Sequence, residues 1–352
     1  MILNELLKIA VQNKCSDMHI NVGIPPIMRR YGSFIPIGNN ALSPKDTKLL
    51  AEQILNAEQG ETLQRNGEVD LALSIPGLFR FRINVFMQRG CYGIAIRLLN
   101  TVIPSFTDLG LPETVAKLAD KSRGLVLVTG PTGSGKSTTL ACMIDKINQE
   151  KERHVITIEE PIEYLHSHKK SIVSQREIGE DTKSFAAALR AALRQDPDVI
   201  LIGEMRDMET ISIALTAAET GHLVLSTLHT VGAAKTIDRI IDVFPPHQQQ
   251  QVRTQLSTVL QGVISQQLIP KRDGNGRVAA VEIMLATPAV RNLIREGKIF
   301  QIPNVMFTGV AQGMSTMDQV IIEFYRNRLI SADDALTYSM DADHVRKSIG
   351  SH

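Results

Sequence analysis

The segment that decides the fold is Gly-Pro-Thr-Gly-Ser-Gly-Lys-Ser, residues 130–137. It fits the pattern G-x-x-x-x-G-K-[ST], in which glycines let the backbone turn so tightly that successive N–H groups surround a phosphate. An apolar run at residues 125–128 precedes it, and residues 138–144 are compatible with a helix. This strand–loop–helix setting is what the pattern requires, and the helix N-terminus adds a dipole that favours an anion. The segment therefore predicts a nucleotide-phosphate site.

The side chains of this loop predict the contacts of the nucleotide. Lys136 would reach the β- and γ-phosphates, and the Ser137 hydroxyl would ligate Mg²⁺. The expected ligands are therefore ATP and Mg²⁺. The full set of predicted nucleotide-binding residues is Thr132, Gly133, Ser134, Gly135, Lys136, Ser137 and Thr138.

Composition limits the class of protein. A chain of 352 residues suggests two domains. The net charge is +1, tryptophan is absent and aromatic residues make up only 4%. A basic surface and stacking platforms are what nucleic-acid binding requires, so we expect no nucleic-acid partner.

Cysteines and apolar runs indicate a cytoplasmic protein. The three cysteines form no C-x-x-C pair, which gives no indication of a disulfide framework or a cysteine zinc site. No secretory signal is visible, and no apolar run reaches the ~18 residues needed for an integral membrane segment. We expect Cys142 to pack inside the helix after the phosphate loop.

The chain divides into two regimes. Its first hundred residues alternate short helices and strands, which predicts a small α+β domain with an antiparallel sheet, residues 1–100. A linker and a helix follow at 101–120, with Pro104 and Gly110 compatible with a hinge. Residues 121–352 begin with strands at 124–129, 155–159, 198–202 and 222–227, separated by helices at 136–149, 183–194 and 207–219. That alternation predicts a parallel sheet flanked by helices. Beyond Ala233 we expect mostly helix, with a strand pair near 263–269 and 278–284.

Acidic residues follow two of the predicted strands. Glu159, Glu160 and Glu163 come at the end of the second strand, where open α/β sheets hold their ligands. After the third strand, Gly203 takes the position where most phosphate-loop enzymes have the Mg²⁺-binding aspartate. Glu204 must then serve the metal, directly or through water. Because an acid committed to Mg²⁺ is a poor base, we assign water activation to Glu163.

Two histidines flank the fourth strand, His222 and His229. A single histidine is more often structural, but two beside a nucleotide site make a γ-phosphate sensor credible. His229 is the better candidate because it lies at the same strand end as the acids. Metal ligation is less favoured, since no third ligand is spaced nearby.

Arginines of the first domain are candidates for charge stabilisation. Arg80 and Arg82 share one face of a predicted strand, and Arg97 lies on its expected neighbour. Guanidinium groups stabilise transition-state charge on a γ-phosphate, often from another subunit. The alternative is a solvated strand face.

Together these motifs resemble those of the secretion ATPase superfamily, of the type II/IV secretion kind. The resemblance covers essentially the whole chain. It rests on the phosphate loop, on Ile-Thr-Ile-Glu-Glu-Pro-Ile-Glu at 156–163 (the aspartate box), on the Walker B box at 196–207 and on the histidine box at 220–230. Ser-Asp-Met-His at 16–19 resembles the start of the family's N-terminal PAS-like domain. The resemblance implies an α/β fold: a PAS-like α+β domain plus a RecA-like P-loop ATPase domain.

Within that superfamily the chain resembles the motors that retract type IV pili. Residues 289–296, Ala-Val-Arg-Asn-Leu-Ile-Arg-Glu, resemble their A-I-R-N-L-I-R-E motif. The chain begins directly at the PAS-like domain and lacks the tetracysteine zinc motif usual in extension and type II secretion relatives. It departs from the pattern twice: Glu160 replaces an aspartate, and Val290 replaces an isoleucine. Changes at Arg291 or Leu293 are expected to stop retraction and spare hydrolysis.

The resemblance implies an assembly and a partner. It implies a homohexamer with ATP sites at subunit junctions, completed by Arg82 and Arg97, with Arg80 as a further candidate. The implied partner is an inner-membrane pilus platform protein (PilC-like), which would place the motor at the inner face of the cytoplasmic membrane. The alternatives are a motor for pilus extension, type II secretion or DNA transport, and a nucleotide-binding scaffold that hydrolyses little.

Overall fold

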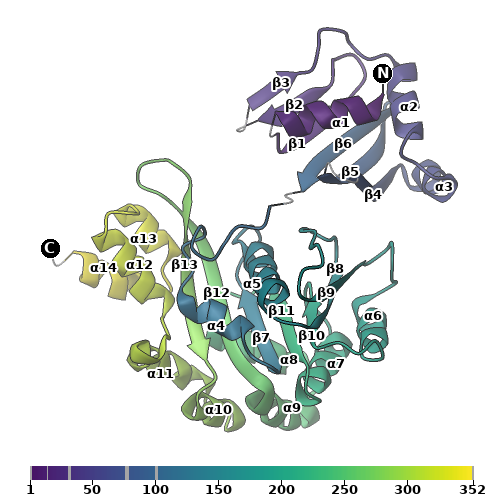
Figure 1. Cartoon of the computed structure of the whole chain (residues 1–352). Coiled ribbons are helices and arrows are strands. Elements are labelled where there is room, and N and C mark those ends of the chain that lie inside the picture. Colours follow the sequence, from purple (N-terminus) through teal and green to yellow (C-terminus); the bar gives the residue numbers. More distant parts are fainter. Residues whose placement is uncertain (1, 14, 31–32, 76–78, 100–101, 351–352) are drawn as a thin grey trace. The chain divides into compact units, whose positions relative to one another are not determined.

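The computed structural model describes residues 2–13, 15–30, 33–75, 79–99 and 102–350. The chain separates into two compact units. Unit 1 comprises Met1–Val102 and Glu163–Leu165, and unit 2 comprises Ile103–Ile162 and His166–His352 (Figure 1). Gly32 and Gly77, where the sequence favours turns between strands, lie outside the described residues.

Unit 1 is built around an antiparallel sheet, as its alternating segments predict. The strand order is β3-β2-β1-β6-β5-β4. The elements are α1 (Leu3–Gln12), β1 (Asp17–Ile20), β2 (Ile27–Arg30), β3 (Ser33–Pro36), α2 (Pro44–Glu52), α3 (Ala57–Asn66), β4 (Glu68–Ile75), β5 (Phe79–Gln88) and β6 (Cys91–Leu99).

Helix α1 buries one face, because Leu3, Leu6, Leu7 and Ala10 recur with helical period and are all at most 3% exposed. The pair Ser43-Pro44 predicts a helix cap followed by the first helical residue, and α2 starts there. The Ser43 hydroxyl accepts from the Asp46 N–H, and Asp46 accepts from the Ser43 N–H in return. Local sequence signals therefore determine where both helices lie.

Unit 2 contains a seven-stranded sheet in the order β13-β12-β7-β11-β10-β8-β9. The pairs from β12 to β9 are parallel, and only β12 with β13 is antiparallel. The predicted parallel-containing α/β fold is confirmed. The elements of this part are α4 (Glu113–Ala119), β7 (Gly124–Thr129), α5 (Lys136–Glu150), β8 (His154–Glu159), β9 (Ile172–Glu177), α6 (Phe185–Ala192), β10 (Val199–Ile202), α7 (Met208–Glu219), β11 (Leu223–Leu228), α8 (Ala233–Asp242), α9 (Pro246–Val259), β12 (Leu260–Pro270) and β13 (Arg277–Leu285).

Helices cover both faces of this sheet, and β7 shows why. Its six residues are all buried, as expected of a strand inside a parallel sheet. Leu125 and Leu127 point into the core formed with α6–α10, whereas Val126 and Val128 point into the core formed with α4 and α5. Successive strand side chains face opposite ways, so one strand anchors two layers.

Smaller helices complete unit 2 after β13. They are α10 (Pro288–Arg295), α11 (Ile302–Thr308), α12 (Met317–Arg326), α13 (Ala332–Tyr338) and α14 (Ala342–Ile349), with two 3₁₀ turns, η1 (Ile299–Gln301) and η2 (Val310–Gln312). The last three helices pack against Ile269 and Ala280 of the β12–β13 hairpin in a core of their own. The hairpin therefore supports the C-terminal helices.

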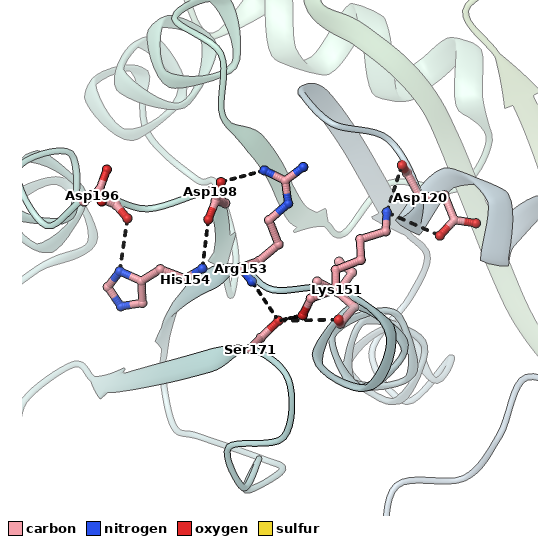
Figure 2. A network of polar contacts seen from close by, with 8 residues as sticks. Asp120, Lys151, Arg153, His154, Ser171, Asp196 and Asp198 are labelled. Carbon is pink, nitrogen blue, oxygen red and sulfur yellow. Dashed lines mark hydrogen bonds and ion pairs between the residues drawn. The ribbon is translucent and has the colours of Figure 1, made fainter.

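At the amino ends of β8, β9 and β10, polar groups bind one another (Figure 2). Asp198 accepts from the Arg153 guanidinium at 2.6 Å and from the His154 N–H at 2.9 Å. The His154 ring contacts the Asp196 carbonyl at 3.2 Å, and the Ser171 hydroxyl donates to the Lys151 carbonyl at 2.6 Å. This amino edge is held by charge and hydrogen bonds within the chain.

The segment before α4 is fixed to helix α5. The Cys142 thiol donates to the Pro104 carbonyl at 2.9 Å, and burial raises the pKa of that thiol to about 12. Ser105 and Asp108 exchange hydrogen bonds of 2.9 and 3.1 Å. Cys142 is buried as predicted, and Pro104 lies in an anchored segment.

Candidate functional site

The phosphate loop connects β7 to α5, and its glycines are required by geometry. A Cβ at Gly130 would lie 2.2 Å from the Gln266 carbonyl oxygen, so no other residue fits there. Gly135 caps helix α5 with φ +90°, a conformation that L side chains rarely adopt. The loop therefore takes a shape that only this glycine pattern permits.

Lys136 lies inside the loop and is only 8% exposed. Its Nζ donates to the carbonyls of Gly130 and Pro131, both at 3.0 Å, so the ammonium group is held over the loop. The Ser134 hydroxyl is buried, and no hydrogen-bond partner for it occurs in the described part of the chain. A buried cation and an unsatisfied hydroxyl at a helix N-terminus are what a phosphate group would satisfy.

The aspartate box lies at the end of β8 and in the loop that follows. Glu159 accepts from Thr157 at 2.7 Å and from Gln175 at 3.3 Å. The buried Glu177 carboxylate accepts from the Ile162 N–H at 3.0 Å, one residue before the exposed Glu163. Strand β9 thus holds the backbone that leads to the predicted base.

The carboxyl ends of β10 and β11 bring Glu204 and His229 together. Glu204 Oε2 lies 3.5 Å from His229 Nε2 and accepts from Arg206 Nε at 2.6 Å. The Glu204 side chain is 13% exposed, whereas that of His229 is 48% exposed. The second histidine, His222, lies at the opposite edge of the sheet, where Nδ1 contacts the Ala217 carbonyl at 2.9 Å. Only His229 shares an edge with the acids.

The arginines of unit 1 are arranged as the strand pattern predicts. Arg82 of β5 lies directly opposite Arg97 of β6, and both side chains are exposed. Arg97 donates to Asp17 at 2.9 Å, whereas Arg82 makes no ion pair or hydrogen bond with any other described residue. The Asp17 carboxylate offsets the charge of Arg97, so the uncompensated charge of the pair lies on Arg82.

Comparison with known proteins identifies the family. The family described as "Type II/IV secretion system protein" matches residues 61–305. The chain belongs to this family. It is 49% identical to the "Type IV pilus retractation ATPase PilT" of Pseudomonas aeruginosa, over 95% of this chain and 97% of that protein. It is 51% identical to the "Twitching motility protein" of Neisseria gonorrhoeae, over 91% of this chain and 86% of that protein.

A solved structure agrees in shape as well as in sequence. It is described as "Crystal Structure of the Pilus Retraction Motor PilT and Bound ADP". Its TM-score is 0.92 at 50% identity, and the match covers 99% of each chain. The two-unit α/β architecture of this type II/IV secretion family member is therefore that of a nucleotide-binding protein.

The donors present in this family member suit Mg²⁺. Ser137 supplies a half-buried hydroxyl at the start of α5, and Glu204 supplies a carboxylate at the end of β10. Hydroxyl and carboxylate oxygens are the ligands that Mg²⁺ takes beside nucleotide phosphates. No group of three His, Cys, Asp or Glu able to hold a metal occurs among the described residues. Any Mg²⁺ would thus depend on phosphate oxygens as well.

Sequence reasoning missed the residues that hold the acids in place. Arg206 was part of the Walker B box, yet nothing in the pattern indicated its bond to Glu204. Gln175 and Glu177 were missed because β9 was not predicted.

No helix in the described part of the chain has both the length and the apolar content to cross a bilayer.

Proposed function

We propose that this chain is a motor ATPase that hydrolyses ATP to power type IV pilus retraction, and hence twitching motility. The observation that carries the proposal is identity of about one half, along nearly the whole chain, to proteins named for retraction and twitching. The phosphate loop with Lys136 held inside it supports nucleotide binding independently of that identity. The related functions in pilus extension, type II secretion or DNA transport are the alternatives.

The residues of unit 2, together with Glu163, divide the chemistry between them. Lys136 would leave its two carbonyls to pair with the β- and γ-phosphates. Ser137 and Glu204 would hold Mg²⁺, which when bound neutralises charge on the phosphates. Glu163 would accept a proton from the attacking water, and Glu177 fixes the peptide beside it. His229, 3.5 Å from Glu204, would report whether the γ-phosphate is present.

The second half of the site comes, in this proposal, from a neighbouring subunit of a homohexamer. Arg82 and Arg97 would stabilise charge on the γ-phosphate, with Arg80 as a further candidate. Mixing Arg82→Ala subunits with Lys136→Ala subunits tests this. Because each variant keeps the part that the other lacks, turnover should partly return. Mixed hexamers as inactive as the separate variants would contradict action across the interface.

Force would pass to an inner-membrane pilus platform protein (PilC-like). The motor would then work at the inner face of the cytoplasmic membrane, as a peripheral protein. The deciding experiment is deletion of the gene in its own organism, scored for pili by electron microscopy. Cells that accumulate pili which never shorten support retraction, whereas bald cells support extension. Complementation by the wild-type gene but not by Lys136→Ala ties the phenotype to hydrolysis.

A further inference from the structure

A pocket of about 390 Å³ lies in unit 2 beside the C-terminal helices. It is lined by the first turn of α8, by α11, and by the starts of α12 and α14. None of its lining residues belongs to the phosphate loop or to the proposed catalytic set. Its volume lies in the range that accommodates a small ligand or a few side chains of a partner. The pocket therefore has a lining of its own, distinct from that of the nucleotide site.

Hydrogen bonds fix the helix ends that form this pocket. The Glu282 carboxylate of β13 accepts from the Ala233 N–H at the start of α8, at 2.6 Å, and from the Met317 N–H at the start of α12, at 3.0 Å. The Asp318 carboxylate accepts from two successive backbone N–H groups just before α14, at 2.7 and 3.0 Å. Each helix end is thus held to a neighbouring element, and the pocket is largely preformed, as ligand sites commonly are.

The charge of the pocket is negative. Glu282, Asp318 and Asp341 contribute three carboxylates, whereas Lys235 is the one permanent cation in the lining. Within the described part of the chain, no cationic side chain forms an ion pair with these three carboxylates. Burial raises the pKa of the Glu282 carboxyl, so a cation brought close to it would favour the ionised form. The pocket therefore suits a positively charged group.

Apolar side chains line the rest of the pocket and continue beyond it. Met306, Phe307 and Met340 belong to the lining, and Phe307 is 54% exposed. Phe300 precedes Phe307 by seven residues, about two helical turns, and is 78% exposed. Val310, three residues after Phe307, is 56% exposed. A small cation would need the pocket alone. The exposed apolar side chains beside it favour a protein segment, which could cover them as well.

We propose that this pocket receives a basic side chain of a partner protein, whose neighbouring apolar residues cover Phe307 and Phe300. Asp341 is exposed, Asp318 is half-buried and Glu282 is buried, so carboxylates extend from the rim of the pocket to its interior. The methionines of the lining suit the methylene stem of a lysine or arginine, because their side chains adapt to irregular partners. The proposal concerns a surface for a partner and does not rest on the proposed function.

Binding of a fluorescent peptide of about eight alternating leucines and arginines to the full chain, without ATP, tests the proposal. Asp341→Asn should weaken binding about three- to fivefold, because asparagine still caps α14 but carries no charge. Asp343→Asn is the matched control. It removes the same charge two residues further along α14, from a residue that does not line the pocket. It should leave the affinity unchanged.

Phe307→Gln tests the apolar part of the same surface. Losing an aromatic contact at the centre of a binding surface should weaken peptide binding about tenfold. Phe34→Gln is the control, since Phe34 is 58% exposed, close to the exposure of Phe307, but belongs to unit 1. This variant should bind the peptide as wild type does.

Equal losses of affinity in a variant and its control, for either pair, would overturn the proposal. So would equally tight binding of a peptide in which glutamate replaces every arginine. Spermidine binding that depends on Asp341 but not on Phe307 would replace the partner protein by a small cation. A lower oligomer mass of Phe307→Gln in analytical ultracentrifugation would replace it by a second copy of this chain. None of these measurements involves ATP hydrolysis, so the proposed function would stand or fall separately.

Discussion

The two edges of the seven-stranded sheet carry polar residues for different purposes. At the amino edge, Asp198, Arg153 and His154 bind one another, and Figure 2 shows bonds that run between neighbouring strands. At the carboxyl edge, Lys136 rests on backbone carbonyls and the Ser134 hydroxyl lies buried without a partner among the described residues. Polar groups that satisfy each other hold a fold together, whereas those left over are available to a ligand.

The same contrast occurs within a single motif. Within the Walker B box, Asp198 lies before β10 and Glu204 lies after it, so one four-residue strand separates the two acids. Asp198 joins β8 to β10 at the amino edge. Glu204 lies beside His229 at the carboxyl edge, with a pocket next to it. One motif therefore supplies a residue that joins strands at one end and a proposed ligand of Mg²⁺ at the other.

Glu163→Gln should have the largest effect on the carboxyl edge. The amide cannot accept a proton from water, so turnover should fall by roughly a hundredfold or more while ATP binding persists. Single-turnover hydrolysis and binding of a fluorescent ATP analogue measure the two quantities. Undiminished hydrolysis would remove Glu163 as the base. A parallel loss of binding would instead indicate a damaged loop.

Arg291→Met tests whether Arg291, within the retraction motif, stabilises the fold as the residues of the amino edge do. Arg291 donates to the carbonyls of Ser257 and Thr258 at the end of α9, both at 2.6 Å, and to Ala286 at 2.8 Å. Losing these charge-assisted bonds should lower the free energy of unfolding by about 2–3 kcal/mol.

The control for that change lies on the same helix. Arg295 is exposed, so Arg295→Met should alter stability by less than about 0.5 kcal/mol. Urea denaturation of the two variants gives the comparison. Equal stability of the two variants would contradict a structural role of Arg291 and would instead favour its role in retraction.

Asp198→Asn should give the smallest effect, and one that depends on pH. Burial opposes ionisation of Asp198, but the His154 N–H and the Arg153 guanidinium outweigh it and lower its pKa. A lowered pKa adds stability above the unfolded-state value near 4, and that stability is lost as the pH falls. The variant should be less stable by about 1 kcal/mol at pH 7, discounted because the pair is partly exposed.

Urea midpoints between pH 7 and pH 3 check this prediction. The difference from wild type should shrink toward pH 3, and kcat should not change. Asp333→Asn, at an exposed carboxylate on α13, is the control. A difference in stability that grows at low pH, or a fall in kcat, would contradict a purely structural role of Asp198 at the amino edge.

The sequence predicted the central elements of the fold because their signals are local. Strand β7 was predicted at its observed bounds, and Ser43 was correctly expected to cap α2. Strand β9 was missed, since Ile172 is 62% exposed and its polar residues serve the neighbouring loop, so no alternation appears. Helix α3 was missed because Leu63 is its one buried residue and Gly60 lies within it.

The candidate site was predictable only where a motif fixes a backbone shape. The phosphate loop is such a case, because Gly130 and Gly135 are required by sterics. That Arg206 binds Glu204, or that Glu177 holds the Ile162 N–H, depends on side chains brought together by strands far apart in sequence. No spacing rule encodes such contacts.

The anchored segment before α4 has a mechanical consequence. Because the Cys142 thiol holds Pro104, and because Phe106, Leu109 and Leu111 pack into the same core as α5, this stretch and the phosphate-loop helix form one stiff body. A segment transmits a displacement only where its contacts keep it from moving independently. Any shift of α5 would therefore carry residues 104–111 with it.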